Sequence, residues 1–268
     1  MSTKDNIISS LSKNLDNLKK DFYNKSESIS TRYTYIDNFL PIDYVTKLHE
    51  LFPRNSKLWH RQKSLRERKK DFNKIQQINE IFSDYFSAIQ SSEVLQLIEK
   101  ITDIKNLNYD KSLYAGGMSA MSSGDFLNPH LDNSHDANRI RYRRLNLLYY
   151  ITPDWQLSNG GNFEIWDNQV KNKIEITSKF NRLVIMETNK RSWHSVNEVK
   201  VNKTRCCLSI YLFTNNSPTG KDYYHVTSFN GRPEQRFLRI YSFLDNFARQ
   251  KFSSFFKISR GKKLINDN

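Results

Sequence analysis

The sequence predicts a mainly β protein with flanking helices, an α+β chain whose main strands lie between residues 111 and 214. Short apolar runs bounded by Gly, Pro and Asn fill this stretch, a pattern typical of strands and turns. On either side of it, apolar residues recur at helical spacing. With 268 residues, 37% of them hydrophobic, the chain is long enough to bury one sizeable core.

The region before these strands is expected to support them. Apolar residues at helical spacing predict an amphipathic helix over residues 4–22. Residues 34–40 read as a strand, and 42–52 and 74–102 as helices. Between the latter two, residues 53–70 carry eight basic residues against one acidic residue. This stretch is therefore strongly basic.

Four apolar runs predict the main strands of the central region. They cover residues 143–151, 163–166, 180–186 and 204–213, and turns are expected at Pro153 to Trp155 and at Gly160-Gly161. A loop should follow over residues 215–231, and then a helix over 233–256. We therefore divide the chain into an N-terminal helical support region with the first strand (1–110), a central β domain (111–214) and a basic C-terminal loop and amphipathic helix (215–268).

His130, Asp132 and His194 form a candidate metal site. Side chains two residues apart on a strand point to the same face, so His130 and Asp132 can reach one ion. A second histidine from a distant strand would complete two imidazoles and one carboxylate, a set typical of non-haem Fe(II) that leaves positions open for O2 and a co-substrate. An H-x-D triplet alone is common. The neighbouring His135 and Asp136 are adjacent and would point to opposite faces.

Arg205 is the second candidate functional residue. On its predicted strand it shares a face with Cys207, Ser209 and Tyr211, and no acidic residue accompanies it there. A buried, unpaired guanidinium is costly, so an anion should meet it, and a bound oxo-acid carboxylate suits its fork of donors. The alternative is a structural ion pair with Glu164 or Glu187.

A family resemblance rests on the order of several short motifs. The chain reads H-x-D at 130–132, L-Y-Y-I at 148–151, D-W at 154–155, G-G at 160–161 and F-N-R-L at 180–183, followed by His194 and Arg205. Over about residues 113–213 this order resembles the prolyl-hydroxylase branch of the Fe(II)/2-oxoglutarate dioxygenases, including the oxygen-sensing enzymes. The resemblance implies a double-stranded β-helix, or jelly roll.

The resemblance also implies roles for individual residues. His130, Asp132 and His194 fall on the iron ligands, and Arg205 and Tyr150 fall on residues that bind the distal carboxylate of 2-oxoglutarate. Fe(II), 2-oxoglutarate and O2 are then expected, with L-ascorbate as reductant. The interval from His194 to Arg205 is two residues longer than in the oxygen-sensing enzymes, and the extra residues fit the polar stretch 198–203.

The implied reaction is prolyl 4-hydroxylation, giving succinate and CO2. The substrate would be a prolyl residue of a peptide or protein, or a free amino acid. One alternative is hydroxylation of a sugar or lipid-linked glycan at a membrane surface. Another is a jelly-roll binding module without turnover, although the intact ligand set argues against it.

The charge of the chain predicts an anionic partner. The net charge is +14, and the helix over 233–256 combines basic residues with an aromatic stripe. Such a helix can lie on a membrane or hold an acidic partner. We favour the simpler interpretation that the stripe packs on the β core. Proline-containing peptides and glycolipids are both candidate partners, and no recognised nucleic-acid module is present.

Cysteine usage and hydropathy bear on the compartment. The two cysteines, Cys206 and Cys207, are adjacent and cannot form an ordinary disulfide. No apolar run approaches the roughly 18 residues of a membrane span, and the first residues lack the apolar stretch of a signal peptide. We expect a cytoplasmic protein, with peripheral contact to a membrane as an option.

Overall fold

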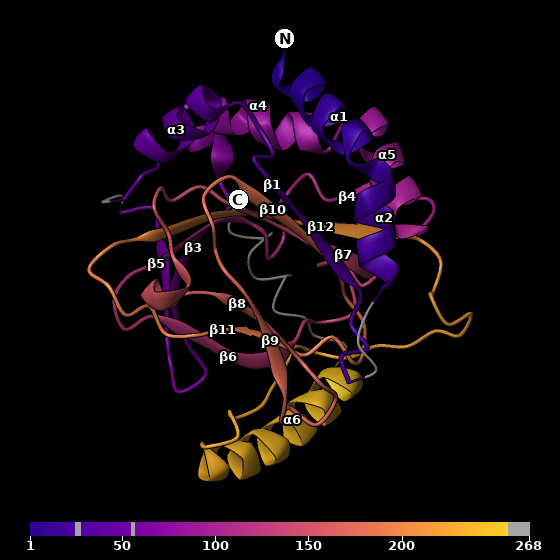
Figure 1. Cartoon of the computed structure of the whole chain (residues 1–268). Helices are drawn as coiled ribbons and strands as arrows, with labels where there is room; N and C mark the ends of the chain where they lie inside the picture. Colours follow the sequence, from indigo (N-terminus) through magenta and orange to yellow (C-terminus); the bar gives the residue numbers. More distant parts are fainter. Residues whose placement is uncertain (25–27, 55–56, 257–268) are drawn as a thin grey trace.

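The computed structural model describes the whole chain except residues 25–27, 55–56 and 257–268. Its centre is one strongly curled sheet with helices on its outside (Figure 1). Every strand pairing is antiparallel. The strands are β1 (Tyr33–Asp37), β2 (His60–Lys63), β3 (Glu67–Phe72), β4 (Asn108–Tyr109), β5 (Gly117–Met121), β6 (Phe126–Leu131), β7 (Tyr142–Tyr150), β8 (Phe163–Trp166), β9 (Lys173–Ile176), β10 (Arg182–Glu187), β11 (His194–Val196), β12 (Arg205–Thr214) and β13 (Ser228–Phe229).

The curl brings two halves of the sheet face to face. One half runs β1-β10-β7-β12-β5, and the other runs β6-β11-β8-β9. Strand β3 joins them because it pairs with both β5 and β6. In Figure 1 the first half lies above the second. The predicted jelly-roll-like β core with flanking helices is confirmed.

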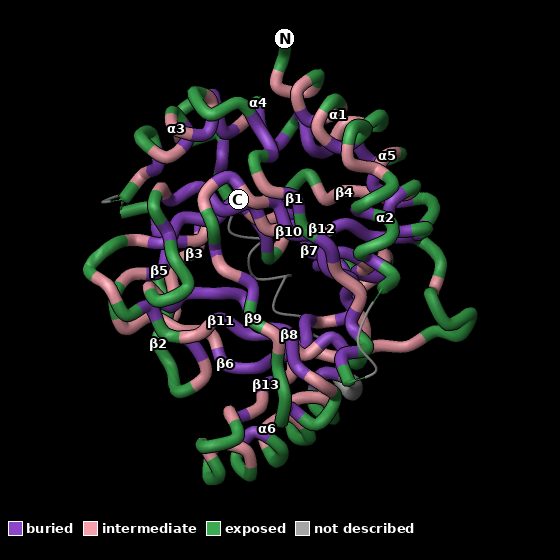
Figure 2. Tube along the Cα trace, in the orientation of Figure 1, coloured by how far each residue is buried: buried purple, intermediate pink, exposed green. Residues whose placement is uncertain are grey.

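The helices before residue 103 cover the outside of the first half (Figure 1). They are α1 (Thr3–Lys13), α2 (Leu15–Tyr23), α3 (Ile42–Glu50), α4 (Glu80–Ile89) and α5 (Ser92–Thr102). Their apolar faces join the outer face of the sheet in one large buried cluster. Figure 2 shows this buried layer in purple beneath exposed outer turns. The helices therefore stabilise the sheet by hydrophobic burial.

Two of the predicted helices are interrupted. The expected helix over 4–22 is broken at Asn14, which ends α1 and precedes α2. Residues 74–102 form a short 3₁₀ turn (Ile75–Gln77) and two α-helices rather than one helix. The Asn79 side chain accepts a hydrogen bond from the Ile81 N–H and so fixes the start of α4.

The basic stretch 53–70 contains a strand pair that the sequence did not reveal. Strands β2 and β3 form a hairpin, and β3 belongs to the central sheet. Strand β1, expected within 34–40, also joins the sheet by pairing with β10. The sheet thus draws strands from both sides of residue 110, while the division into three segments stays a prediction.

The last helix, α6 (Arg236–Phe256), lies on the second half of the sheet, at the bottom of Figure 1. Up to Phe252, most of its large apolar side chains face away from the sheet, with Phe237 90% exposed and Phe243 72% exposed. The interpretation that this stripe packs on the β core is therefore wrong. None of the helices within the described residues combines the length and the apolar character that a bilayer crossing requires.

Candidate metal centre and co-substrate site

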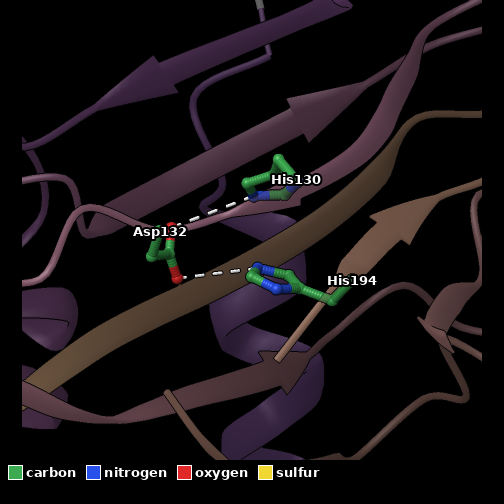
Figure 3. Close-up of side chains that lie close together, drawn as sticks. All are labelled: His130, Asp132 and His194. Carbon is green, nitrogen blue, oxygen red and sulfur yellow. Dashed lines mark ion pairs between the residues drawn. The ribbon is translucent and has the colours of Figure 1, made fainter. Parts of the chain in front are cut away.

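Three side chains from the second half of the sheet converge inside the curl. His130 lies near the end of β6, Asp132 follows that strand, and His194 begins β11. The two histidines meet because β6 and β11 pair with His194 opposite His130. One ligand atom from each of the three side chains lies within 4.8 Å of the others, and all three are buried. Figure 3 shows both imidazoles turned toward the carboxylate.

The donor atoms have suitable separations for one ion. His130 Nε2 lies 3.9 Å from Asp132 Oδ1, and His194 Nε2 lies 3.6 Å from Asp132 Oδ2. Ligands at about 2.1 Å from a metal and at right angles would be roughly 3 Å apart. The observed separations exceed that value by less than an ångström.

Backbone carbonyls orient both imidazoles. His130 Nδ1 lies 3.1 Å from the Asn128 carbonyl oxygen, and His194 Nδ1 lies 2.8 Å from the Ser192 carbonyl oxygen. A carbonyl only accepts, so each Nδ1 carries the proton and each Nε2 keeps its lone pair. This is the tautomer that a metal needs from Nε2.

The protonation of the cluster also suits a cation. Burial, followed by the charge of His194, lowers the pKa of His130 to about 3. Burial alone would raise the pKa of Asp132, but His194, Arg143 and His130 together lower it. Asp132 Oδ2 is buried and has no hydrogen-bond donor among the described residues. The set therefore offers two imidazoles and one ionised carboxylate with an open oxygen, which fits Fe(II).

His135 and Asp136 lie outside this cluster. The His135 ring packs against Tyr142, 4.4 Å between centroids. The Asp136 carboxylate accepts hydrogen bonds from Arg141 and from the Ile140 N–H, so it shapes the turn before β7. Neither residue competes for the metal.

The second predicted group, Arg205 and Tyr150, is also buried inside the curl. Arg205 is 3% exposed and its guanidinium carbon lies 4.7 Å from the centre of the Tyr150 ring. Tyr149 points the other way and donates a hydrogen bond to Asn181, so the two tyrosines lie on opposite faces as predicted.

The Tyr150 hydroxyl is fully buried and makes no hydrogen bond to a described residue. Arg205 and Ser178 still lie close enough to counter part of the effect of burial, which raises the pKa of Tyr150. The phenol therefore stays protonated and can donate. A buried donor without an acceptor is costly, which indicates an acceptor supplied by a ligand.

The structural alternative for Arg205 is wrong within the described residues, because no carboxylate among them lies within 4.0 Å of its guanidinium. Glu164 pairs with Arg232, 2.7 Å between the charged atoms, and with Lys173. Glu187 pairs with Arg32, also at 2.7 Å.

Ser178 and Gly161 hold Arg205 in place, and the sequence did not single out either for this role. The Arg205 Nε donates to Ser178 Oγ at 2.9 Å, and that hydroxyl donates to the Gly161 carbonyl at 2.7 Å. Gly161 has φ +63°, and a Cβ there would lie 3.0 Å from Arg205 Cδ. The G-G pair, which we interpreted only as a turn, thus makes room for the guanidinium.

Arg143 and Tyr211 complete the surroundings of Asp132. Tyr211 Oη donates to Asp132 Oδ1 at 3.3 Å, and Arg143 Nη1 lies 3.4 Å from the same oxygen. Arg143 is 2% exposed, and its Nε and Nη2 have no hydrogen-bond acceptor in the described part of the chain. The neighbouring Arg144 lies elsewhere, 3.9 Å from Glu187 between their charged atoms.

Phe229 of β13 is a further neighbour that no sequence pattern indicated. Its ring stacks on His130 with 5.5 Å between centroids and an angle of 23°. The Asn246 side chain of α6 accepts from the Phe229 N–H and donates to the Phe229 carbonyl. Phe229 therefore contacts both the C-terminal helix and His130, a predicted metal ligand.

The comparisons with known proteins agree with this geometry. Residues 116–213 match the family model of the 2OG-Fe(II) oxygenase superfamily. This stretch is a 2OG-Fe(II) oxygenase domain. The matched stretch contains all three convergent side chains together with Tyr150 and Arg205. No curated protein matches the sequence of this oxygenase significantly.

Solved structures of prolyl hydroxylases share its fold. A prolyl hydroxylase from Trichoplax adhaerens, in complex with a hypoxia inducible factor peptide, superposes with a TM-score of 0.54 at 18% identity, covering 76% of this chain and 91% of that one. A Pseudomonas putida prolyl-4-hydroxylase gives 0.51 at 18% identity, with 76% and 98% covered. Prolyl 4-hydroxylases from Phytophthora capsici give 0.54 at 16%, with 93% and 77% covered.

The family assignment makes this oxygenase an enzyme of the dioxygenase type. It confirms Fe(II) as cofactor and 2-oxoglutarate and O2 as co-substrates, and the buried His-Asp-His set fits the metal. The use of L-ascorbate and the roles of individual residues stay predictions.

Proposed function

We propose that this oxygenase hydroxylates a prolyl residue of a peptide or protein. One observation supports the reaction class. The curled sheet encloses a buried His-Asp-His set together with a buried Arg205–Tyr150 pair that has no carboxylate partner among the described residues. Support for a prolyl substrate comes from the fold shared with prolyl hydroxylases, one of which was solved with a peptide.

In this proposal His130, Asp132 and His194 hold the Fe(II). Bound Fe(II) and 2-oxoglutarate supply the oxidative decarboxylation that gives succinate and CO2 and drives oxygen insertion into a C–H bond. The Nδ1 contacts with carbonyl oxygens hold each imidazole in the orientation that turns its Nε2 toward the Asp132 carboxylate. Burial of the three side chains excludes water that would quench the reaction.

Arg205 and Tyr150 bind the distal carboxylate of 2-oxoglutarate. A carboxylate has enough lone pairs to accept from a guanidinium and a phenol together, which would give the Tyr150 hydroxyl the acceptor it lacks. The hydrogen bond from Arg205 Nε to Ser178 Oγ fixes the orientation of the guanidinium. Its terminal nitrogens can then donate to the carboxylate. Charge pairing also offsets the desolvation of the guanidinium.

Arg143 is the residue we assign to the substrate. Its buried Nε and Nη2 need acceptors, and a peptide carbonyl or a carboxylate beside Asp132 would provide one. The ring of Tyr211 lies 3.9 Å from the guanidinium carbon and limits how far Arg143 can move. The Arg143 guanidinium is thus positioned to bind a substrate next to the metal.

The reaction class is tested by succinate formation with Fe(II), 2-oxoglutarate and O2. We expect Asp132→Ala and His194→Ala to abolish succinate and to lose bound metal, whereas His60→Ala, on the exposed β2 strand, keeps both. Arg205→Met should raise the concentration of 2-oxoglutarate needed for half-maximal rate by at least tenfold with the metal retained, and Arg205→Lys should recover part of the loss. Unchanged turnover in Asp132→Ala would refute the ligand assignment.

The substrate is tested separately with proline-containing peptides. We expect a product heavier by one oxygen atom, located on proline by tandem mass spectrometry, and no product from peptides with alanine at that position. A product on free proline, or on a sugar or lipid-linked glycan in a cell extract, would replace the peptide proposal by the corresponding alternative. The cytoplasmic location stays a prediction.

A further inference from the structure

The C-terminal helix α6 is attached to the sheet by its polar side. Asn246 binds both backbone groups of Phe229, and Gln250 accepts from the Val226 N–H and donates to the Tyr224 carbonyl. Arg239 donates to the carbonyl oxygens of Val170 and Gln169. The inward side of α6 is therefore held to the rest of the protein by hydrogen bonds and not by apolar packing.

The opposite side of α6 is an exposed apolar face. It consists of side chains that are between 51% and 90% exposed: Phe237, Ile240, Tyr241, Phe243, Leu244, Phe247 and Phe252. Their spacing, mostly of three and four residues, places them along one side of the helix, over about 23 Å at 1.5 Å per residue. Figure 2 shows this side of α6 as largely exposed. Contiguous apolar surfaces of this kind mark binding sites.

The charges on and around this face are positive. Arg236 and Lys251 are exposed on it, while Asp245, the one acidic residue within α6, is held inward by Arg66, 2.6 Å between their charged atoms, and by Arg249 at 2.7 Å. Glu234 precedes the helix. The apolar face is therefore bordered by cations.

The β2–β3 hairpin extends the same surface. The Arg66–Asp245 ion pair and the Arg66 guanidinium, 5.8 Å from the Tyr241 ring centre, place the hairpin turn beside α6. Leu65 at this turn is 73% exposed. Exposed basic residues flank it on both strands: Arg61, Lys63 and Arg68. A second apolar side chain with positive neighbours thus lies next to the helix.

We propose that the outward face of α6, together with the Leu65 turn, binds the surface of an anionic lipid bilayer. The face is a convex helix with aromatic side chains and flanking cations, which is the arrangement of helices that lie in the interface plane of a membrane. Anionic headgroups attract the cations while the apolar side chains enter the acyl boundary. The polar inward side anchors the barrel to the bound helix.

The charges disfavour a second copy of this chain as the occupant. Two such faces in contact would bring Arg236 and Lys251 of both copies together without an acidic partner on either face. The surface is also a ridge and not a groove, so it suits a deformable surface better than a rigid protein.

The test is flotation of the full-length protein with vesicles of phosphatidylcholine, with and without phosphatidylserine. We expect binding to the anionic vesicles only, weakened at high salt. Phe237→Ser combined with Phe247→Ser should weaken binding at least tenfold, and Arg236→Gln with Lys251→Gln should weaken it several-fold. The matched control replaces two exposed apolar residues elsewhere, Ile42→Ser and Leu157→Ser, and should bind like the wild type.

Insertion is measured separately through Tyr241→Trp, whose fluorescence should shift to the blue and be quenched by brominated lipids in anionic vesicles. Binding without such a shift, or binding that the Phe237/Phe247 variant retains, would contradict the proposal. Absence of vesicle binding would also overturn it. If sedimentation then showed a dimer that the Phe237/Phe247 variant does not form, the face would be assigned to a second copy. Retention of the protein on polyglutamate would assign the face to an acidic polypeptide. None of these results depends on the prolyl substrate.

Discussion

The helices before residue 103 and the single helix α6 lie outside opposite halves of the curled sheet. The first group contacts the sheet through apolar side chains, whereas α6 contacts it through polar ones. The helices before residue 103 bury their apolar faces, and residues such as Leu11 and Phe22 are fully inaccessible. Helix α6 instead presents polar side chains to the sheet and leaves its aromatic face outside. Amphipathicity alone therefore does not fix which side of a helix faces a core.

The difference has a physical cause in what lies beneath each helix. The first half of the sheet offers α1, α2, α4 and α5 an apolar surface. Under α6 lie the loop around Val170 and the short segment from Val226 to β13, whose backbone groups are bonded by side chains of α6. Buried backbone groups need partners, so amide and guanidinium side chains are the better match there.

Replacing a phenylalanine on each side should give the largest contrast. Phe22→Ala removes a fully buried ring and should lower the free energy of unfolding by about 3–5 kcal/mol. Phe237→Ala, at a side chain 90% exposed, should change it by no more than about 0.5 kcal/mol. Urea unfolding of both variants measures this. Similar losses in the two would mean that α6 buries its aromatic side after all.

Acid should destabilise the segment that lies under α6. Burial lowers the pKa of His225 to about 4 from its ordinary 6.5. The folded state therefore favours the neutral imidazole, and stability is lost as the pH falls from about 6.5 toward 4. At about 1.4 kcal/mol per pH unit, the loss is at most about 3 kcal/mol. Metal-free His225→Asn should show a correspondingly smaller fall in unfolding free energy between pH 7.5 and 5, and an identical fall would refute the assignment.

The polar attachment of α6 should depend on Asn246. Asn246→Ala leaves the buried Phe229 N–H and carbonyl without their partner, at a cost of about 2 kcal/mol. Faster amide hydrogen exchange across α6 and β13, with α1 to α5 unaffected, would show that the loss is local. Uniform acceleration in both helical groups would instead indicate a general loss of stability.

The ion pair between the hairpin and α6 should contribute least. Arg66 and Asp245 are both partly exposed, at 17% and 19% of their side chains, so Asp245→Asn should cost no more than about 1 kcal/mol, and less at high salt. Thermal unfolding at two salt concentrations tests this. A salt-independent loss well above that value would show that Asp245 acts through packing.

Much of the site was accessible from the sequence because it depends on short-range rules. Alternation along a strand predicted that Tyr149 and Tyr150 face opposite ways, and the cost of a buried charge favoured an Arg205 that does not pair with Glu164. The convergence of His130 with His194 followed from the motif order. These inferences needed only the residue types and their spacing.

The rest depended on tertiary pairing that no local pattern records. β13 has only two residues, too few to show alternation, so the stacking of Phe229 on His130 was not foreseeable. The β2–β3 hairpin was hidden by its many charges. The direction of the α6 stripe was wrongly predicted, because periodicity identifies a face but not what it meets.

The pairing of β6 with β11 has a consequence for how the protein is handled. Because His130 and His194 come from strands far apart in the sequence, an unfolded chain cannot present both to one ion. A divalent metal should then raise the unfolding midpoint in proportion to the logarithm of its free concentration. Chelating agents used in purification would remove that contribution, and metal content would serve as a gauge of correctly assembled enzyme.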